Sequence, residues 1–458
     1  MSELQQTLTQ LRGALGEAAV LTGEAISPQH HSDWTNNAPA RPAALLLPRN
    51  TEQVASALRI CHAARQSLVP QGGLTGLAAG AEPRAYDIAL SLERLEGIEE
   101  IDSAAATITV RAGTRLEKIQ QAAAEAGFLF PLDLGARGSC HIGGNIATNA
   151  GGNSVIRYGM TRDQVLGLEV VLGDGRVLNL MNKMIKNNTG YDLKQCFIGS
   201  EGTLGVITRA VLKLAPARSS MATALCALPD YASAVSLLRC LQRELGTPEA
   251  YELMWPDYYQ LGVSWLENPH APLNDNYPLY VLLDTCATRE ALESFLDRAM
   301  EGEQVLDAVL ASSESQARHL WKIREASGEF PTRMRPLSFD VSLPIGRIGE
   351  FVDDICQRLE AQWPGQRSYY FGHIGDSNLH LTLDCNALPQ PAPLLAVEEL
   401  VYTAVGDMGG SISAEHGIGL LKRDFLHHSV DPQTLAVMRQ LKQSFDPYNL
   451  LNPGKVLP

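Results

Sequence analysis

Two histidines separated by a short turn are the residues whose type and spacing point most directly to chemistry. His373 and His380 lie between two apolar, strand-like segments, 368–371 and 381–383, and residues 375–378 have the composition of a tight turn. Strand, turn and strand predict a β-hairpin. Both histidines are equally far from the turn centre, so in a regular hairpin their imidazoles face each other. Cross-strand Cβ atoms lie about 5 Å apart, which is close enough for both rings to hold one metal ion.

A carboxylate for the same ion is available further along the chain, in the segment Ser413–Gly417. Two histidines with Glu415 leave an open coordination position, which is typical of a catalytic rather than a structural metal. A polar hairpin with two solvated histidines is the alternative interpretation of the same residues. The other histidine pairs, His30–His31 and His427–His428, are expected to be solvated.

The composition limits the class of protein. A chain of 458 residues predicts two or three domains, and 45% hydrophobic with 19% charged residues is typical of a soluble globular protein. The net charge of −14 argues against a surface for nucleic acid or an anionic membrane. The eight cysteines include no CxxC spacing, so an iron–sulfur or zinc-knuckle motif is absent. They are typical of buried free thiols in a reducing compartment.

The sequence shows no recognisable targeting signal, which favours a cytoplasmic location. Residues 1–20 carry acidic side chains and no continuous apolar stretch, which fits neither a signal peptide nor an Arg-rich transit peptide. No segment reaches the ~18 consecutive apolar residues of a transmembrane helix. We therefore expect the protein in the cytoplasm.

The chain changes character twice, which predicts three parts and an α+β fold. Residues 1–216 mix strands with Gly-rich loops, without the regular βα alternation of a Rossmann sheet. In residues 217–400, strands alternate with amphipathic helices, which favours an antiparallel sheet covered by helices. Residues 401–458 are expected to be mostly helical.

Three Gly-rich segments are suited to a phosphorylated cofactor: 70–77, 139–152 and 198–207. Their glycines let backbone N–H groups approach a pyrophosphate without interference from Cβ. None is a GxGxxG that follows a strand at the start of a βαβ unit, so the dinucleotide-binding fingerprint is absent. No GxxxxGK[ST] occurs either, which argues against an ATPase. A single such loop is usually a connector, but three in one stretch of the chain indicate a ligand site.

These motifs together resemble a known family. The chain is similar to the flavin-linked D-2-hydroxy-acid dehydrogenases, which include glycolate oxidase, D-lactate dehydrogenase and D-2-hydroxyglutarate dehydrogenase. The motifs occur in the family's order over about residues 40–458, and the segments that carry the resemblance are 70–76, 142–145, 148–152, 199–205, 373–380, 415–419 and 452–455.

The resemblance implies an FAD-binding domain of the vanillyl-alcohol-oxidase (p-cresol methylhydroxylase) type in residues 1–216. It implies a substrate or cap domain in 217–400 and a helical segment, 401–458, that completes the flavin and metal site. It also implies a divalent metal, usually zinc, on His373, His380 and Glu415. The first loop lacks an attachment histidine, so the FAD is expected to be non-covalent. The implied cofactor-binding residues are Pro70, Gln71, Gly72, Gly73, Leu74, Thr75, Gly76, Leu77, Ser139, Ile142, Gly143, Gly144, Asn145, Thr148, Asn149, Gly151, Gly152, Glu201, Gly202, Ile207 and Asn452.

The sequence departs from the family pattern at three positions. Leu74 stands where many members have Asn, and the hydroxyglutarate enzymes carry Lys near Ser338 and Asn near Thr382. Because Lys and Asn help to bind the second carboxylate, their loss favours a shorter or more apolar acid over 2-hydroxyglutarate. Arg333 or Arg335 could supply the missing cation.

Oxidation of a 2-hydroxy acid needs a base for the hydroxyl proton and a cation for the carboxylate. His416 follows Glu415, and adjacent side chains point in different directions, so we expect His416 to face the substrate as the general base. Arg324, near the end of a predicted helix, matches the carboxylate-binding arginine of the family. Either residue could instead be a solvated surface group.

Two other functions fit the same motifs. One is the flavin subunit of a glycolate-oxidase-type complex, which would need a separate iron–sulfur partner. The other is a non-catalytic flavin electron-transfer protein, against which the complete set of His373, His380, Glu415 and His416 argues. The expected partners are a small 2-hydroxy acid and an electron acceptor such as a quinone or an electron-transfer flavoprotein. Nucleic acid is not expected, and a homodimer is possible.

Overall fold

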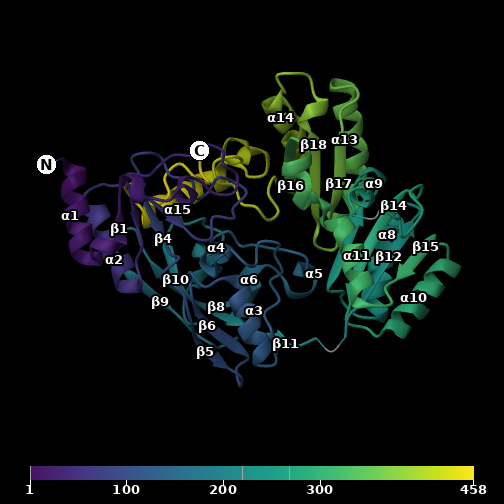
Figure 1. Cartoon of the computed structure of the whole chain (residues 1–458), viewed down its shortest axis with the longest axis horizontal. Helices are drawn as coiled ribbons and strands as arrows, with labels where there is room; N and C mark the ends of the chain where they lie inside the picture. Colours follow the sequence, from purple (N-terminus) through teal and green to yellow (C-terminus); the bar gives the residue numbers. More distant parts are fainter. Residues whose placement is uncertain (1, 219, 268) are drawn as a thin grey trace. The chain divides into compact units, whose positions relative to one another are not determined.

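The computed structural model describes residues 2–218, 220–267 and 269–458, which form two compact units. The first unit contains the chain up to Gly152, together with Tyr158–Ala217 and Glu415–Pro458. The second contains Asn153–Arg157 and Arg218–Ala414. The last segment of the chain, Glu415–Pro458, therefore packs with the first unit, although it directly follows the second unit in the sequence. Figure 1 labels many of the elements of both units.

A small, partly parallel sheet of the first unit carries the first Gly-rich loop. Its strand order is β1 (Val20–Leu21), β2 (Ala44–Leu46), β4 (Ile88–Ser91) and β3 (Leu68–Gln71), with β2, β4 and β3 parallel. Helix α2 (Thr51–Ala63) begins where the Asn50 side chain accepts a hydrogen bond from the Gln53 N–H, as expected for an N-cap. Loop 70–77 therefore starts at the end of a buried strand.

A second sheet of this unit is entirely antiparallel. Its order is β5 (Ile98–Asp102), β6 (Thr107–Arg111), β10 (Val206–Lys213), β8 (Val165–Val171) and β9 (Val177–Leu180). One apolar cluster includes Leu90 of the first sheet and Val110 and Val170 of the second, so both sheets share a core. The helices of the unit include α1 (Glu3–Leu15), α3 (Leu116–Glu125), α4 (Ile142–Ala147) and α15 (Pro432–Phe445).

The second unit is built on a seven-stranded sheet in which every pairing is antiparallel. Its strand order is β15 (Asp307–Leu310), β12 (Ala222–Leu228), β14 (Leu279–Thr285), β13 (Ala250–Met254), β17 (Ser368–His373), β18 (Asn378–Asp384) and β16 (Pro336–Ser342) (Figure 1). The sequence prediction of an antiparallel sheet with helices is confirmed.

Helices cover this sheet on different faces. Tyr258 of α9 (Pro256–Ser264) and Ile323 of α11 (Glu314–Arg324) share an apolar cluster with Phe371 of β17. On β16, Phe339 packs edge-on against Tyr402 of α14 (Leu394–Asp407), with ring centroids 5.3 Å apart. Because strand side chains alternate, the neighbours of Phe339 point to the opposite face, the face that carries the polar residues described below. The remaining long helices are α8 (Tyr231–Glu244), α10 (Arg289–Glu301) and α13 (Ile348–Gln362).

Two further sequence expectations can be compared with the described residues. The cysteines there are free thiols, and Cys61, Cys140, Cys226 and Cys385 are buried. Among the described residues, no helix combines the length and the apolar character that crossing a membrane would require.

Candidate active site

The first two Gly-rich loops lie against each other in the first unit. A Cβ on Gly73 would come within 2.2 Å of the Ser139 carbonyl oxygen, and a Cβ on Gly72 would lie 3.6 Å from the Cα of Gly144. Contact this close between two backbones is possible only without a side chain at Gly73. Loop 70–77 and loop 139–152 therefore lie side by side with their backbones in contact.

The third loop joins the same surface through the backbone. The Gly199 N–H donates to the Ile146 carbonyl at 3.1 Å, and the Glu201 N–H donates to the Ala147 carbonyl at 2.8 Å. From the C-terminal segment, the Asn452 amide donates to the carbonyls of Gly80 and Glu201, both at 2.8 Å. All three predicted cofactor loops therefore meet at one place, and a residue near the C-terminus joins the third loop to Gly80, which lies just beyond the first loop.

The polar atoms left at this place suit a flavin dinucleotide. His141 Nδ1, Asn145 Oδ1 and Asn452 Oδ1 are buried and lack a hydrogen-bond partner in the described structure. Buried polar groups normally have a partner, so these atoms indicate a polar ligand between the loops. Leu74 has a left-handed backbone conformation with φ of 58°, and Asn149 has a similar φ of 51°. Asn adopts this conformation far more readily than Leu does.

Several side chains predicted to touch the cofactor instead bind protein atoms. The Gln71 amide donates to the carbonyls of His30 and Ala81 and contacts His30 Nδ1. The Thr148 hydroxyl donates to the Gly144 carbonyl, and Asn149 Oδ1 accepts from the Arg162 N–H. These side chains shape the loops. His30, expected to be solvated, is only 3% exposed because it packs against Gln71, so that expectation was wrong.

Glu201 holds the segment that contains the predicted base. Its carboxylate accepts the N–H groups of Ile418 at 2.7 Å and Gly419 at 2.9 Å. Burial raises the pKa of Glu201, and the two N–H groups oppose that shift. Within the same unit, Glu415 Oε1 accepts the Gly152 N–H at 2.7 Å. The segment 415–419 is thus fixed against both the second and third cofactor loops.

In the second unit, β17 and β18 form the predicted hairpin with a different register. His380 pairs with Phe371, and His373 pairs with Glu252 of β13, so the two histidines are not direct cross-strand partners. The turn is a short 3-10 helix, Ile374–Asp376, followed by a left-handed Ser377, and this irregular turn shifts the pairing. The imidazoles nevertheless lie close, with ring centroids 5.3 Å apart.

Each of these imidazoles has a buried carboxylate on its Nδ1 side. His373 Nδ1 lies 2.6 Å from Glu252 Oε1, and His380 Nδ1 lies 3.9 Å from Asp340 Oδ1. Asp340 also accepts a hydrogen bond from the Asn378 amide at 2.7 Å. A carboxylate behind a histidine is the usual support of a metal ligand, because it fixes the ring with Nε2 directed to the ion. The donor set of the hairpin therefore fits a divalent metal.

Arg324 belongs to the same group of residues. It ends α11, is buried, and its Nε donates to Glu252 Oε2 at 2.8 Å. Its guanidinium carbon lies 4.7 Å from the centre of the Phe371 ring. Burial alone would raise the pKa of Glu252, but the charges of His373 and Arg324 hold it at about 2. The alternative of a solvated Arg324 is excluded by its burial.

The position of the expected second-carboxylate contact is neutral. Ser338 and Thr382 are paired in register, and their hydroxyls lie 3.0 Å apart. Arg333, which could have supplied a cation there, forms an ion pair with Glu329 and lies over the Trp265 ring at 5.0 Å.

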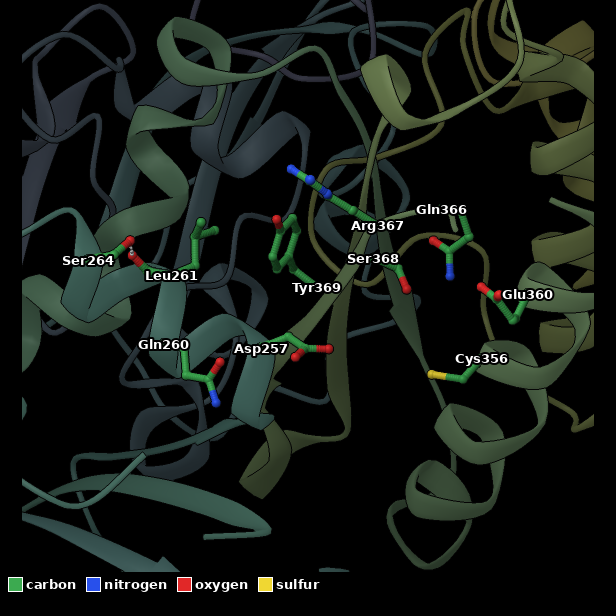
Figure 2. Close-up of a pocket in the computed structure, with 10 residues that line it drawn as sticks. All are labelled: Asp257, Gln260, Leu261, Ser264, Cys356, Glu360, Gln366, Arg367, Ser368 and Tyr369. Carbon is green, nitrogen blue, oxygen red and sulfur yellow. Dashed lines mark hydrogen bonds between the residues drawn. The ribbon is translucent and has the colours of Figure 1, made fainter. Parts of the chain in front are cut away.

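A separate cavity of about 660 Å³ lies in the second unit (Figure 2). Asp257, Gln260 and Ser264 line it from α9, and Cys356 and Glu360 line it from α13. None of the residues predicted to be catalytic, metal-binding or cofactor-binding is among its lining residues.

Comparison with known proteins now identifies the family. Residues 42–181 match an FAD binding domain, and residues 217–456 match the C-terminal domain of FAD linked oxidases. The chain belongs to the FAD-linked oxidases. The protein is therefore an FAD-dependent oxidoreductase, and loops 70–77 and 139–152 lie within the part of the chain that matches the FAD binding domain.

Similar proteins of known name cover nearly the whole chain. D-2-hydroxyglutarate dehydrogenase from Xanthomonas citri pv. viticola is 38% identical over 99% of this chain and 96% of its own length. The Stutzerimonas stutzeri enzyme of the same name is 36% identical over 98% of both chains. The mitochondrial enzyme of that name from Bos taurus is 40% identical over 93% of this chain and 79% of its own length.

Solved structures share the fold. p-Cresol methylhydroxylase with substrate bound has a TM-score of 0.78 at 16% identity and covers 100% of this chain and 97% of its own. 4-Ethylphenol oxidase from Gulosibacter chungangensis has the same TM-score at 17% identity and covers 99% and 97%. The predicted fold class, with an FAD domain of the p-cresol methylhydroxylase type, is confirmed.

The sequence analysis missed Glu252 and Asp340. Each is an acidic residue inside a strand of otherwise apolar residues, 250–254 and 339–341. A charged residue within a strand that the sequence predicts to be buried can be recognised as a candidate site residue, because a buried charge needs a partner or a ligand.

Proposed function

We propose that the protein oxidises a D-2-hydroxy acid to the corresponding 2-oxo acid, with FAD as the hydride acceptor and a divalent metal, zinc in the first instance, as an additional cofactor. The observation that carries the proposal is the polar face of the second unit, where Arg324, His373 and His380 surround Glu252 and Phe371. The names of the similar enzymes support the same substrate class.

Arg324 is the proposed carboxylate-binding residue. Because Nε is engaged by Glu252, its two Nη groups are the donors that remain for a substrate carboxylate. An arginine held in this way presents a planar fork that matches a carboxylate in two hydrogen bonds. This contact would fix C2 of the acid relative to the histidine pair.

His373 and His380 are the proposed metal ligands, and Glu415 is proposed as the third. A divalent ion supplies positive charge for the alkoxide that develops at the substrate hydroxyl. His416 is the proposed base that takes the hydroxyl proton, since a neutral imidazole near pH 7 suits this transfer. The hydrogen on C2 would leave with its electron pair to the flavin and the hydroxyl proton would leave to His416, so that the acid would lose two electrons and two hydrogens in all.

The neutral pair Ser338 and Thr382 favours an acid without a second carboxylate. Unless Arg333 or Arg335 supplies a cation, a second carboxylate placed there would lose water without gaining a charged partner, which disfavours its binding. We therefore propose a shorter or more apolar D-2-hydroxy acid as the preferred substrate. For the reoxidation of the flavin we propose a quinone or an electron-transfer flavoprotein.

The test is a screen of R- and S-2-hydroxy acids with the FAD-loaded protein and an artificial dye as electron acceptor. We expect turnover of R-configured acids, with a higher kcat/KM for D-lactate or longer monocarboxylates than for D-2-hydroxyglutarate. Arg324→Ala should lower kcat/KM by about 100-fold or more, the usual cost of a lost charge-assisted pair. If no 2-hydroxy acid leads to reduction of the dye, the proposal is refuted. A clear preference for D-2-hydroxyglutarate would refute only the proposal that a shorter or more apolar acid is preferred.

A further inference from the structure

Glu252 occupies a position where a charged residue is costly. It lies in the middle of β13, Ala250–Met254, in which all five residues are buried, and its side chain is fully buried. Replacing a buried ion pair by apolar residues is often neutral or stabilising, so stability alone does not account for a carboxylate here. Its two oxygens have separate partners: Oε1 lies 2.6 Å from His373 Nδ1, and Oε2 accepts from Arg324 Nε.

We propose that Glu252 is a positioning residue that sets His373 for metal binding and Arg324 for carboxylate binding at the same time. The inference rests on the proposed function, since it assigns those two roles to His373 and Arg324. It adds that one carboxylate couples the orientation of the metal ligand to that of the substrate-binding arginine.

The effect on His373 follows from the chemistry of imidazole. In the neutral ring one nitrogen carries a proton and the other has a lone pair, and only the lone pair can bind a metal. A carboxylate accepts hydrogen bonds and donates none, so Glu252 requires the proton on Nδ1. The lone pair is then on Nε2, and the ring is held by a hydrogen bond of 2.6 Å.

The effect on Arg324 follows from the geometry of the guanidinium. Glu252 fixes Nε at 2.8 Å, and the ring of Phe371 lies 4.7 Å from the guanidinium carbon. An edge contact and a face contact together define the plane of the group. The backbone of the residue is held as well, because the Tyr258 hydroxyl donates to the Arg324 carbonyl at 2.5 Å.

The corresponding support of His380 is weaker. Asp340 lies 3.9 Å from His380 Nδ1 and already accepts the Asn378 amide. The distance from Asp340 to His380 Nδ1 is thus longer than the 2.6 Å from Glu252 to His373 Nδ1, and we expect the removal of Glu252 to have the larger effect on metal binding.

Glu252→Gln is the decisive variant, because the amide has almost the same shape and one acceptor fewer. The site needs two acceptors, one for Arg324 Nε–H and one for His373 Nδ1–H. If the amide oxygen faces Arg324, the NH2 group faces His373, and the ring must then carry its proton on Nε2, which cannot bind metal. If the oxygen faces His373, Arg324 loses its partner.

The experiment measures Zn²⁺ and Co²⁺ affinity of the full-length, FAD-loaded protein in competition with a chromophoric chelator. We expect Glu252→Gln to bind metal 10–100-fold more weakly than the wild type, with FAD content unchanged. Glu249→Gln is the matched control. Glu249 is also buried, lies three residues earlier and pairs with Arg157 and Arg218, so its variant should keep the metal affinity of the wild type.

Glu252→Asp is prepared in parallel, so that the inference can still be tested if Glu252→Gln does not fold. It keeps the charge on a shorter side chain that cannot reach both partners, and it should bind metal more weakly than the wild type. Wild-type affinity in the folded Gln or Asp variant overturns the positioning role alone. A wild-type protein that binds neither ion overturns the metal site of the proposed function, and this inference with it.

Discussion

Asp284 provides a test of the electrostatics of the second unit that does not depend on catalysis. It lies in β14 and accepts hydrogen bonds from the Thr223 hydroxyl at 2.5 Å and from Trp321 Nε1 at 3.0 Å. Both donors are neutral. Burial raises the pKa of Asp284 from 3.8 to about 6, against the opposing effect of these hydrogen bonds and of Arg218. The ionised carboxylate is therefore destabilising at neutral pH.

The sign and size of the effect follow from proton linkage. The carboxyl of Asp284 binds its proton more tightly in the folded state than in the unfolded state. The stabilisation that this gives is complete below pH 3.8 and is lost as the pH rises through about 6. The shift corresponds to at most ~3 kcal/mol, and partial exposure of the side chain reduces this to about 1–2 kcal/mol. Asp284→Asn removes the charge and keeps both contacts, because the amide oxygen can accept from Trp321 while its NH2 donates to Thr223.

Thermal unfolding of the wild type and of Asp284→Asn between pH 4.5 and 8 measures the effect of the Asp284 charge on stability. At pH 7.5 we expect the variant to have the higher Tm, by roughly 2–8 °C, and at pH 4.5 the difference should fall to about a third of that value. Asp230→Asn is the control, because Asp230 caps α8 through the Ser233 N–H and has a lowered pKa, so it should gain nothing. A lower Tm of Asp284→Asn at pH 7.5, or a gain that is independent of pH, would refute the reasoning.

Three further predictions concern the cofactor and metal residues. Leu74→Asn should raise the free energy of unfolding by about 1 kcal/mol with FAD content retained, because Asn tolerates the φ of 58°; a drop in Tm in a thermal melt would contradict it. His373→Ala should lower bound metal and turnover together, as elemental analysis beside dye-reduction rates would show, and full activity without metal would exclude the site. His416→Asn should keep FAD and metal but reduce kcat by about 10²–10⁴-fold, the usual range for a positioned base; near-normal turnover would remove it from the mechanism.

Local chemistry explains the parts of the structure that were predictable from the sequence. Asn50, a residue type favoured at N-caps, caps α2, and the turn residues after His373 do close a hairpin. The three Gly-rich loops were recognisable because only glycine permits a contact such as that of Gly73 with Ser139. These features depend on residues close in sequence or on conformations that few residues adopt.

Features that depend on distant partners were not predictable in the same way. The register of the hairpin depends on a 3-10 turn and on pairing with β13, which lies more than a hundred residues earlier. Arg324 resembles any helical surface arginine until Glu252, 72 residues away, is placed beside it. The amides of Gln71 and Asn452 were recognised as cofactor-loop residues, but their protein partners could not be read from the sequence.

Two acidic residues on neighbouring strands differ in the direction in which their surroundings shift the pKa. Glu252 of β13 and Asp284 of β14 lie in paired strands, where Glu252 is opposite Leu282 and Asp284 is opposite Ala250. Both are withdrawn from water, yet the pKa of Glu252 falls to about 2 and that of Asp284 rises to about 6. The difference lies in their partners, since Arg324 and His373 surround the first and neutral donors surround the second.

A carboxylate that stays ionised in a buried strand must be stabilised by groups that are themselves charged or polarised, and such groups can also bind an ionic substrate. The charged group and the imidazole that contact Glu252 lie at the β13 and β17 side of the sheet. That is the side on which the carboxylate-binding arginine and the metal-binding histidines are proposed.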